Sequence, residues 1–162
     1  MPVEKLLDFF FMHIRNLWRV DGLYFLGIEA KFGTEVAKKI DADVWEMMAK
    51  LEAKSLQKMF ATGENPSVEV IMNLLRKSSW ALDQPFKSIE IDGKRAILEV
   101  KRCRTQETRL CKGLREFPCK QVRLGYLKKF AETLNPTVRV TCLTCPPDKH
   151  PENSWCRWEF TM

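Results

Sequence analysis

All six cysteines of this 162-residue chain lie between positions 103 and 156, and their spacing is the strongest chemical signal in the sequence. Cys142 and Cys145 form a Cys-x-x-Cys pair, and Cys156 follows after a proline-containing stretch. A tight turn after a strand brings two such thiolates within reach of one ion, and zinc binds four soft ligands in a tetrahedron. The spacing therefore predicts a zinc site, with either Cys119 or His150 as the fourth ligand.

Side-chain alternation supports a common site for these thiols. In the predicted strand 137–143, Cys142 lies on the apolar face, because successive residues point to opposite sides of a strand. By the same rule Cys156 lies on the apolar face of the predicted strand 155–161. Pairing of the two strands would direct both thiols toward the core, near the loop that carries Cys145.

Three other uses of the cysteines remain open. An iron–sulfur cluster also takes four thiolates, but the irregular spacing matches no ferredoxin pattern. Single buried cysteines are common core residues. Disulfides belong to oxidising compartments, whereas thiols stay reduced in the cytoplasm. The spacing favours zinc over all three.

The N-terminal segment argues for a cytoplasmic protein. Residues 6–14 are apolar but are interrupted by Asp8 and His13, and no small-residue cleavage site follows, so we expect no signal peptide. No stretch is long and apolar enough to span a bilayer, so we expect no membrane partner.

Cys103 is the cysteine that we would test first as a nucleophile. Cations follow it closely in the sequence, and neighbouring cations lower a thiol pKa and increase its reactive fraction. A catalytic cysteine also needs a base, and the chain has only two histidines, His13 and His150. His13 lies between apolar residues of a predicted helix, so the sequence offers this nucleophile little support.

The segment 101–129 is strongly basic, with ten Lys or Arg and two acids. Such asymmetry predicts an anionic partner, either nucleic acid or a phosphate- or carboxylate-bearing ligand, although a solvated basic face is an equally simple explanation. Within it, Arg104, Arg109 and Arg115 are candidates to anchor an anionic head group by bidentate hydrogen bonds. The sequence has no glycine-rich phosphate-binding motif.

Hydrophobic periodicity predicts helices first and strands later. Helical spacing runs from position 6, with an interruption at Asp21-Gly22 and a stop at Phe32-Gly33-Thr34, where Thr34 is the expected N-cap. Asn65-Pro66 is expected to start a further helix that ends near Trp80. Beyond Pro85 the period becomes two, and the remaining expected elements are a hairpin at Asp92-Gly93, an irregular or weakly helical stretch 104–118, a helix 122–134 and strands 137–143 and 155–161.

These elements define an α+β fold in a single domain, 1–162, in which a helical segment, 1–82, packs on an antiparallel sheet in 83–162. Several large side chains of the helical segment have the spacing of core residues, and a ligand cavity is the alternative use for them. They are Trp18, Tyr24, Phe25, Trp45, Met47, Met48 and Trp80.

The C-terminal motifs resemble a known family. Phe117-Pro118-Cys119, Gly125-Tyr126-Leu127, Cys142 to Pro147 and Trp155 to Phe160 are similar to an uncharacterised prokaryotic family that is related to L-2-amino-thiazoline-4-carboxylic acid hydrolase-like proteins. Residues 85–162 also resemble, more distantly, the 4-vinyl reductase domain.

The second resemblance implies a small-molecule-binding module whose zinc is held at Cys119, Cys142, Cys145 and Cys156. In that family a glutamate occupies the position of Cys142, and the loop before Cys156 is shorter. An all-thiolate sphere has no open position for water, so the implied zinc is structural and not catalytic.

The sequence therefore leads to three hypotheses. The first is a small-molecule-binding or sensory module with a structural four-cysteine zinc site and an anionic or aromatic ligand. The second is a hydrolase of the thiazoline type that uses Cys103. The third, not favoured, is a nucleic-acid-binding protein that uses the basic segment 101–129. A homodimer is compatible with each of them.

Overall fold

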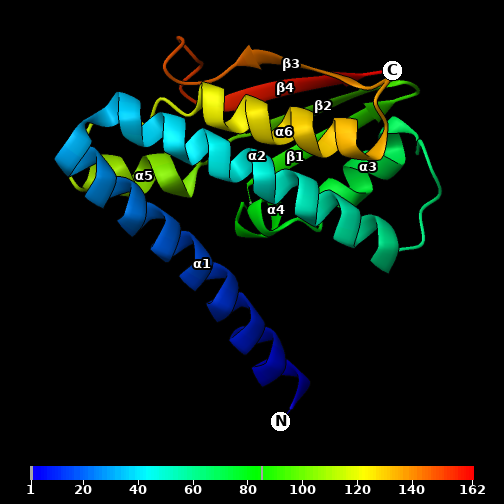
Figure 1. Ribbon diagram of the computed structural model, residues 1–162, viewed down its shortest axis with the longest axis horizontal. Coiled ribbons are helices and arrows are strands. Elements are labelled where there is room, and N and C mark those ends of the chain that lie inside the picture. The colour runs from blue at the N-terminus through cyan, green and yellow to red at the C-terminus, as the bar shows by residue number, and fades with distance from the viewer. Residues whose placement is uncertain (1, 85) are drawn as a thin grey trace.

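The computed structural model describes residues 2–84 and 86–162, and it has the α+β architecture expected from the sequence (Figure 1). Six helices and four strands are described: α1 Val3–Phe32, α2 Thr34–Met59, α3 Val68–Leu75, α4 Ser79–Asp83, β1 Lys87–Asp92, β2 Arg95–Val100, α5 Arg104–Cys111, α6 Lys120–Leu134, β3 Arg139–Thr144 and β4 Cys156–Thr161.

The four strands form one antiparallel sheet in the order β1-β2-β4-β3. The Asp92-Gly93 hairpin is confirmed: Asp92 pairs with Arg95, and Gly93 has a φ of 55°, which glycine adopts without strain. The strand alternation predicted for β3 and β4 is also confirmed, because Cys142 pairs with Trp158 on the face that packs against the core.

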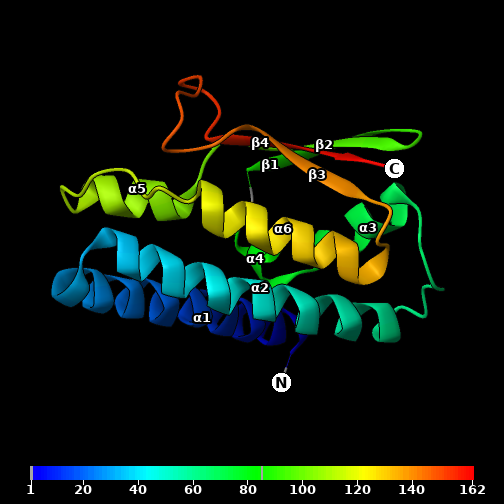
Figure 2. The ribbon, with the colours of Figure 1, turned by 45° about the horizontal axis from the view of Figure 1, so that its top comes forward.

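The molecule is built in layers (Figure 2). The sheet covers α6 and α3, and α6 in turn packs on the long helix α2, with α1 beside α2 on the outside. Tyr126, Leu127 and Phe130 of α6 are fully buried between the sheet and α2. Gly125 lies at the closest approach of these two helices, where an added Cβ would meet Glu46 Oε1 at 2.6 Å.

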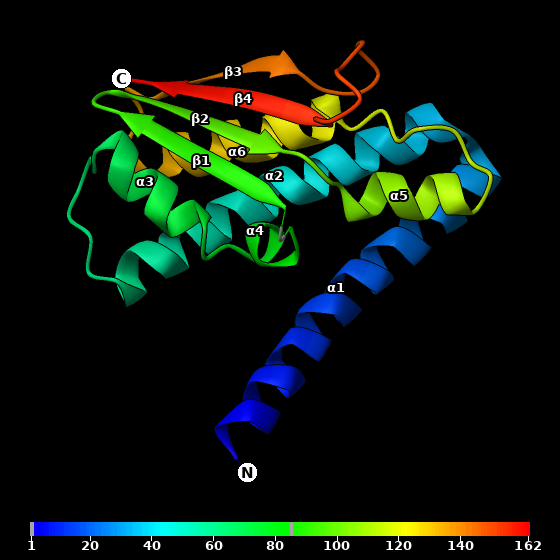
Figure 3. The ribbon, with the colours of Figure 1, turned by 180° about the vertical axis from the view of Figure 1, so that it is seen from behind.

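Helix α1 differs from the prediction, because it runs through Asp21-Gly22 without interruption. A glycine inside a helix costs about 1 kcal/mol relative to alanine, and packing of Trp18 and Phe25 on either side of Gly22 outweighs that cost. The N-terminal half of α1 projects away from the rest of the molecule (Figures 1 and 3). Large apolar side chains in residues 3–14 are exposed there.

Three predicted helix ends are wrong. The turn before α2 centres on Gly33, with a φ of 83°, and Thr34 is the first helical residue instead of the cap. Ser67, and not Asn65, caps α3 through its side chain. The helix expected to end near Trp80 is two helices, since Ser78 caps α4 through a second side-chain hydrogen bond.

Candidate functional site

A cavity of about 520 Å³ opens between α1, α5 and the start of α2. The stretch of α1 that borders it begins at Arg15 and ends at Leu26, and the facing stretch of α5 begins at Arg104. Its walls combine aromatic, basic and acidic side chains. They are Arg15, Trp18, Arg19, Asp21, Gly22, Leu23, Phe25, Leu26, Asp41, Asp83, Arg104, Thr105, Thr108, Arg109, Lys112 and Phe117.

A small inner chamber of about 40 Å³ continues from the inner end of this cavity. Five residues border both spaces and form the neck between them: Trp18, Asp21, Asp41, Thr105 and Phe117. The indole rings of Trp18 and Trp45 stack there with centroids 4.7 Å apart and planes inclined by 7°. The predicted core role is confirmed for Phe25, Trp45 and Trp80, with Trp18 and Met48 packed against the core, whereas Tyr24 and Met47 are exposed. Trp18 and Phe25 also line the cavity, and Trp18, Trp45 and Trp80 line the chamber.

Two carboxyl groups lie at the neck. Asp21 of α1 accepts a hydrogen bond of 3.1 Å from Trp45 Nε1. Burial raises the pKa of Asp21, and it raises the pKa of Asp41 to about 7, where the negative charge of Asp21 adds to the effect. The guanidinium of Arg123 lowers both pKa values, but burial dominates. One site therefore holds two interacting acids, of which one is partly protonated at neutral pH.

Two polar groups beside these acids have no hydrogen-bond partner in the described part of the chain. Gln84, which borders the inner chamber, is 2% exposed, and its Oε1 accepts no hydrogen bond there. Arg123 also borders the chamber, with its guanidinium 4.5 Å from the centroid of the Trp80 ring, and its Nη1 is buried without an acceptor. Buried polar groups are nearly always satisfied in folded proteins, so both groups mark a polar site.

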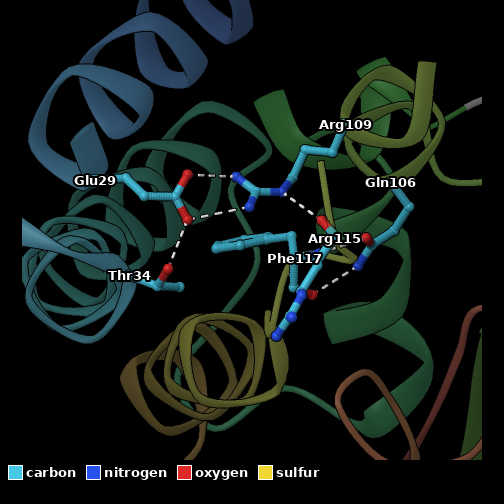
Figure 4. Close-up of polar contacts among 6 residues, drawn as sticks. All are labelled: Glu29, Thr34, Gln106, Arg109, Arg115 and Phe117. Atoms are coloured by element: carbon cyan, nitrogen blue, oxygen red, sulfur yellow. Dashed lines mark hydrogen bonds and ion pairs between the residues drawn. The ribbon is translucent and has the colours of Figure 1, made fainter. Parts of the chain in front are cut away.

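The three arginines predicted to bind a ligand are placed differently from one another, and Figure 4 shows two of them, Arg109 and Arg115. Arg104 and Arg109 border the cavity, and Arg115 does not. Arg104 forms an ion pair of 2.8 Å with Asp83. The guanidinium of Arg109 is bidentate to Glu29, at 2.9 and 3.1 Å, so its charge is already neutralised. Arg115 contributes its backbone carbonyl, which accepts a hydrogen bond from Arg109 Nε, while its side chain is exposed.

The cysteines expected to bind zinc converge at the end of the sheet next to α6. The sulfurs of Cys119 and Cys145 are 3.4 Å apart, and Cys156 also lies within hydrogen-bonding reach of Cys145. Cys142 lies on the same face of the sheet and is less deeply buried. The hydrogen bond between the Cys119 and Cys145 thiols lowers the pKa of Cys119 and raises that of Cys145.

The thiol donors of this cluster are of the type that zinc prefers, but the spacing of two of the sulfurs differs from that of a zinc site. Four zinc-bound thiolates lie about 3.8 Å apart for Zn–S distances of about 2.3 Å, so the Cys119–Cys145 pair is slightly too close. Across residues 2–84 and 86–162, no group of three or more His, Cys, Asp or Glu side chains is arranged to hold a metal ion. The zinc site stays a prediction. The other suggested ligand, His150, packs on Trp155 and lies 3.7 Å from Glu116.

The cations that closely follow Cys103 in the sequence do not lower its pKa in the structure. Burial raises the pKa of this thiol to about 12, because the thiolate is poorly solvated there and the cations that follow it in the sequence point elsewhere. Cys103 is therefore a protonated thiol at neutral pH and a poor nucleophile.

Much of the charge of the basic segment is paired. Arg102 binds Glu107, Lys120 binds Asp148, and Arg104 and Arg109 have the partners given above. These ion pairs reduce the positive field that nucleic-acid binding requires.

Sequence reasoning missed the acids at the neck, although a signal for them exists. Asp21 lies three residues after Trp18 and four before Phe25, and Asp41 lies four before Trp45, so each interrupts an apolar helical stripe. A carboxylate on a core-facing stripe is a candidate functional group. No comparable pattern marks Gln84, which comes to the chamber from the irregular end of α4.

Comparison with known proteins identifies the family of this chain but gives no activity for it. It belongs to DUF6125, a family of unknown function, whose model matches residues 1–162. No curated protein matches it. Among solved structures, it is similar to the phenol-responsive sensory domain of the transcription activator PoxR with phenol, at a TM-score of 0.55 and 14% identity, covering 86% of this chain and 71% of that one.

The comparisons give no support to the relation with thiazoline hydrolases or with the 4-vinyl reductase domain. At 14% identity the structural match shows a shared fold and nothing more about ligands. Among the helices of the described residues, none has the length and apolar character required to cross a bilayer.

Proposed function

We propose that this protein is a small-molecule-binding module of the sensory type, with its ligand in the cavity between α1 and α5. The cavity carries the proposal: its volume of about 520 Å³ lies within the range of about 300–1,000 Å³ typical of ligand sites. The fold it shares with the phenol-responsive domain of PoxR supports the same function.

The walls suit an aromatic or anionic ligand. Trp18, Phe25 and Phe117 offer ring faces and edges for stacking. Arg15 and Arg19 stand on successive turns of α1 at the outer region of the same cavity, where cations would attract a carboxylate or phosphate.

We also propose that Cys119, Cys142, Cys145 and Cys156 hold one structural zinc ion. The soft thiol donors of all four residues and the convergence of α6, β3 and β4 at this point support it, and zinc binding would separate the sulfurs of Cys119 and Cys145 from 3.4 Å to about 3.8 Å. When bound, zinc would supply a cross-link between these elements. The residues themselves bring one thiol from the N-cap of α6, two from the end of β3 and its loop, and one from the start of β4.

Two glycines of α1 provide a matched test of the cavity. Gly22 borders the cavity, Gly27 is exposed outside it, and an added Cβ meets no atom within 4 Å at either position. We expect Gly22→Trp to fill the cavity and Gly27→Trp to leave it open. Ligand-observed NMR with phenol, benzoate and a library of aromatic carboxylates and amines would measure binding to both variants and to the parent protein.

The expected result is that at least one compound binds the parent and Gly27→Trp and that Gly22→Trp abolishes its binding. Circular dichroism would verify that both variants keep their helix content. Binding that survives in Gly22→Trp, or no binding of any compound to the parent, would overturn the proposal.

A further inference from the structure

The acids at the neck of the cavity are not matched by the charges around them. Asp21 and Asp41 share the neck, and Arg123 of α6 is the cation that acts on both. Arg123 is held away from a simple ion pair by its aromatic neighbours, since it lies 4.5 Å from the Trp80 ring centroid and 5.1 Å from that of Tyr126. No ion pair within 4.0 Å joins Arg123 to either acid among the described residues. The donors at the neck and chamber are Trp45 Nε1 and the Arg123 guanidinium, whose Nη1 is unpaired in the described part of the chain, and the two carboxyl groups together offer more acceptor sites than these donors fill.

Gln84 independently indicates a lack of hydrogen-bond donors at the neck. Gln84 is almost completely buried beside the neck, and its Oε1 has no donor in the described part of the chain. An amide oxygen without a donor in a buried site is costly, and a ligand that donates hydrogen bonds removes that cost. The ionised carboxyl groups and this amide oxygen accept hydrogen bonds, so a group with several N–H donors would satisfy them.

The outer region of the cavity has the opposite character. Arg15, Arg19 and Lys112 border it, and none of them has an acidic partner within 4.0 Å in residues 2–84 and 86–162. The cations Arg104 and Arg109 are paired with Asp83 and Glu29. The cavity is thus polarised. Its inner end holds two carboxyl groups and one cation, Arg123, whereas its outer region holds three cations without an acidic partner within 4.0 Å among the described residues, of which Arg15 also acts on Asp83 at longer range.

On the basis of the proposed ligand-binding function, we propose that the cavity takes a small amphoteric molecule, with a protonated amino or amidino group at Asp21, Asp41 and Gln84 and a carboxylate at the rim. An ammonium group carries three donors and a positive charge, which suits two carboxyl groups and one amide oxygen. The aromatic side chains Trp18 and Phe117 then contact the apolar portion of the ligand between its two ends. The raised pKa of Asp41 is consistent with this, because a cation at the neck would restore its ionised form.

Four compounds with one ring and different ends test this assignment. They are 4-(aminomethyl)benzoate, benzylamine, 4-methylbenzoate and 4-methylbenzyl alcohol, each titrated into the full chain by isothermal titration calorimetry. Charge-assisted hydrogen bonds are about twice as strong as neutral ones, so we expect 4-(aminomethyl)benzoate to bind at least about tenfold more tightly than 4-methylbenzoate. Benzylamine should bind more tightly than the alcohol for the same reason.

Replacing Asp41 at the neck tests whether ligand affinity depends on the charge of this side chain or on its shape. Asp41→Asn keeps the size of the side chain and should weaken binding of both amines by about tenfold, while the affinity for 4-methylbenzoate changes by less than about twofold. Asp43→Asn, on the exposed side of the same helix and outside the cavity, should leave all four affinities unchanged.

The two proposals fail in different ways. If 4-methylbenzoate binds as tightly as 4-(aminomethyl)benzoate, if the alcohol binds as tightly as benzylamine, or if Asp41→Asn affects all four compounds alike, the amine assignment is wrong while the cavity stays a ligand site. If no compound binds at millimolar concentration, both the assignment and the ligand site are contradicted.

Discussion

The indole Nε1 of Trp45 donates a hydrogen bond of 3.1 Å to Asp21 Oδ1, and this bond joins α2 to α1 at the neck of the cavity. Trp45 lies one helical turn after Asp41, so the same turn of α2 supplies both the donor and the second carboxyl group. The bond fixes Asp21 in a position where it also raises the pKa of Asp41. The acid pair is therefore a product of the α1–α2 packing.

Asp41 should make the stability of the protein depend on pH in an unusual direction. Its pKa of about 7 in the folded protein exceeds the ordinary value of 3.8, because of burial and of Asp21, with Arg123 opposing them. The folded state then binds more protons than the unfolded state between pH 3.8 and about 7, so the contribution of Asp41 falls as pH rises through this window and is constant above it.

The Asp41→Asn variant removes this titration. At pH 8 we expect it to be more stable than the parent by about 1 kcal/mol or more, a rise of about 3 °C in Tm, and at pH 4 the difference should vanish. Thermal unfolding followed by circular dichroism at several pH values measures both, with Asp43→Asn as the control. A difference that does not depend on pH would show that Asp41 titrates normally.

The Arg109–Glu29 pair should be structural. The Arg109 side chain is 10% exposed and the Glu29 side chain 16% exposed, and the Arg109 guanidinium lies 5.6 Å from the Phe25 ring centroid. Removing one partner leaves the other charge largely buried, so Arg109→Met should lower the free energy of unfolding by about 2 kcal/mol or more. Arg115→Met, which removes only an exposed side chain, should change it by less than about 0.5 kcal/mol.

Urea denaturation at pH 7 would compare these two variants. Equal changes in the free energy of unfolding would mean that the ion pair stabilises the protein no more than an exposed arginine side chain does. The pKa of Glu29 is lowered chiefly by its hydrogen bonds from Arg109, so the stabilisation is present above pH 4.5 and is lost as pH falls below it. This loss of stability at acidic pH should be absent in Arg109→Met.

The sheet was more predictable from sequence than the cavity was. Alternation with period two and the Asp92-Gly93 turn depend on neighbouring residues only, and they predicted β1, β2 and the inward direction of Cys142 and Cys156. The cavity depends on α1 facing α5, about eighty residues later in the chain, and on the Glu29–Arg109 pair across that distance. No local pattern encodes such a contact.

Residue type was likewise a better guide than residue role. Arginines in 104–115 were expected to anchor a ligand, but Arg109 is neutralised by a glutamate from the opposite helix, which sequence order does not reveal. The pKa of Cys103 was misjudged for the same reason: sequence neighbours were cations, while the spatial neighbours exclude water. The pairing of Arg109 and the pKa of Cys103 both depend on spatial neighbours that only the tertiary structure brings together.

The intrinsic fluorescence of the protein should report ligand entry. Trp18 borders both spaces and stacks on Trp45, so a bound ring changes the polarity around this pair. We expect saturable changes in emission on titration with 4-(aminomethyl)benzoate, reduced by more than about half in Trp18→Phe, because one of the two rings is then no longer an indole. Trp155→Phe, outside the cavity, should leave the change intact; loss of the signal there would place the ligand elsewhere.

The cysteine cluster predicts a specific pattern of metal retention. Purified protein should contain one zinc per chain by elemental analysis and should be colourless, since four thiolates on zinc absorb no visible light whereas an iron–sulfur cluster does. Cys145→Ser should lose the zinc, because its sulfur lies 3.4 Å from that of Cys119 and within reach of that of Cys156. Cys111→Ser, exposed on α5, and Cys103→Ser should retain it. Metal-free parent protein with six titratable thiols would contradict the zinc proposal, and zinc kept by Cys145→Ser but lost by Cys103→Ser would show that the ligand set is a different one.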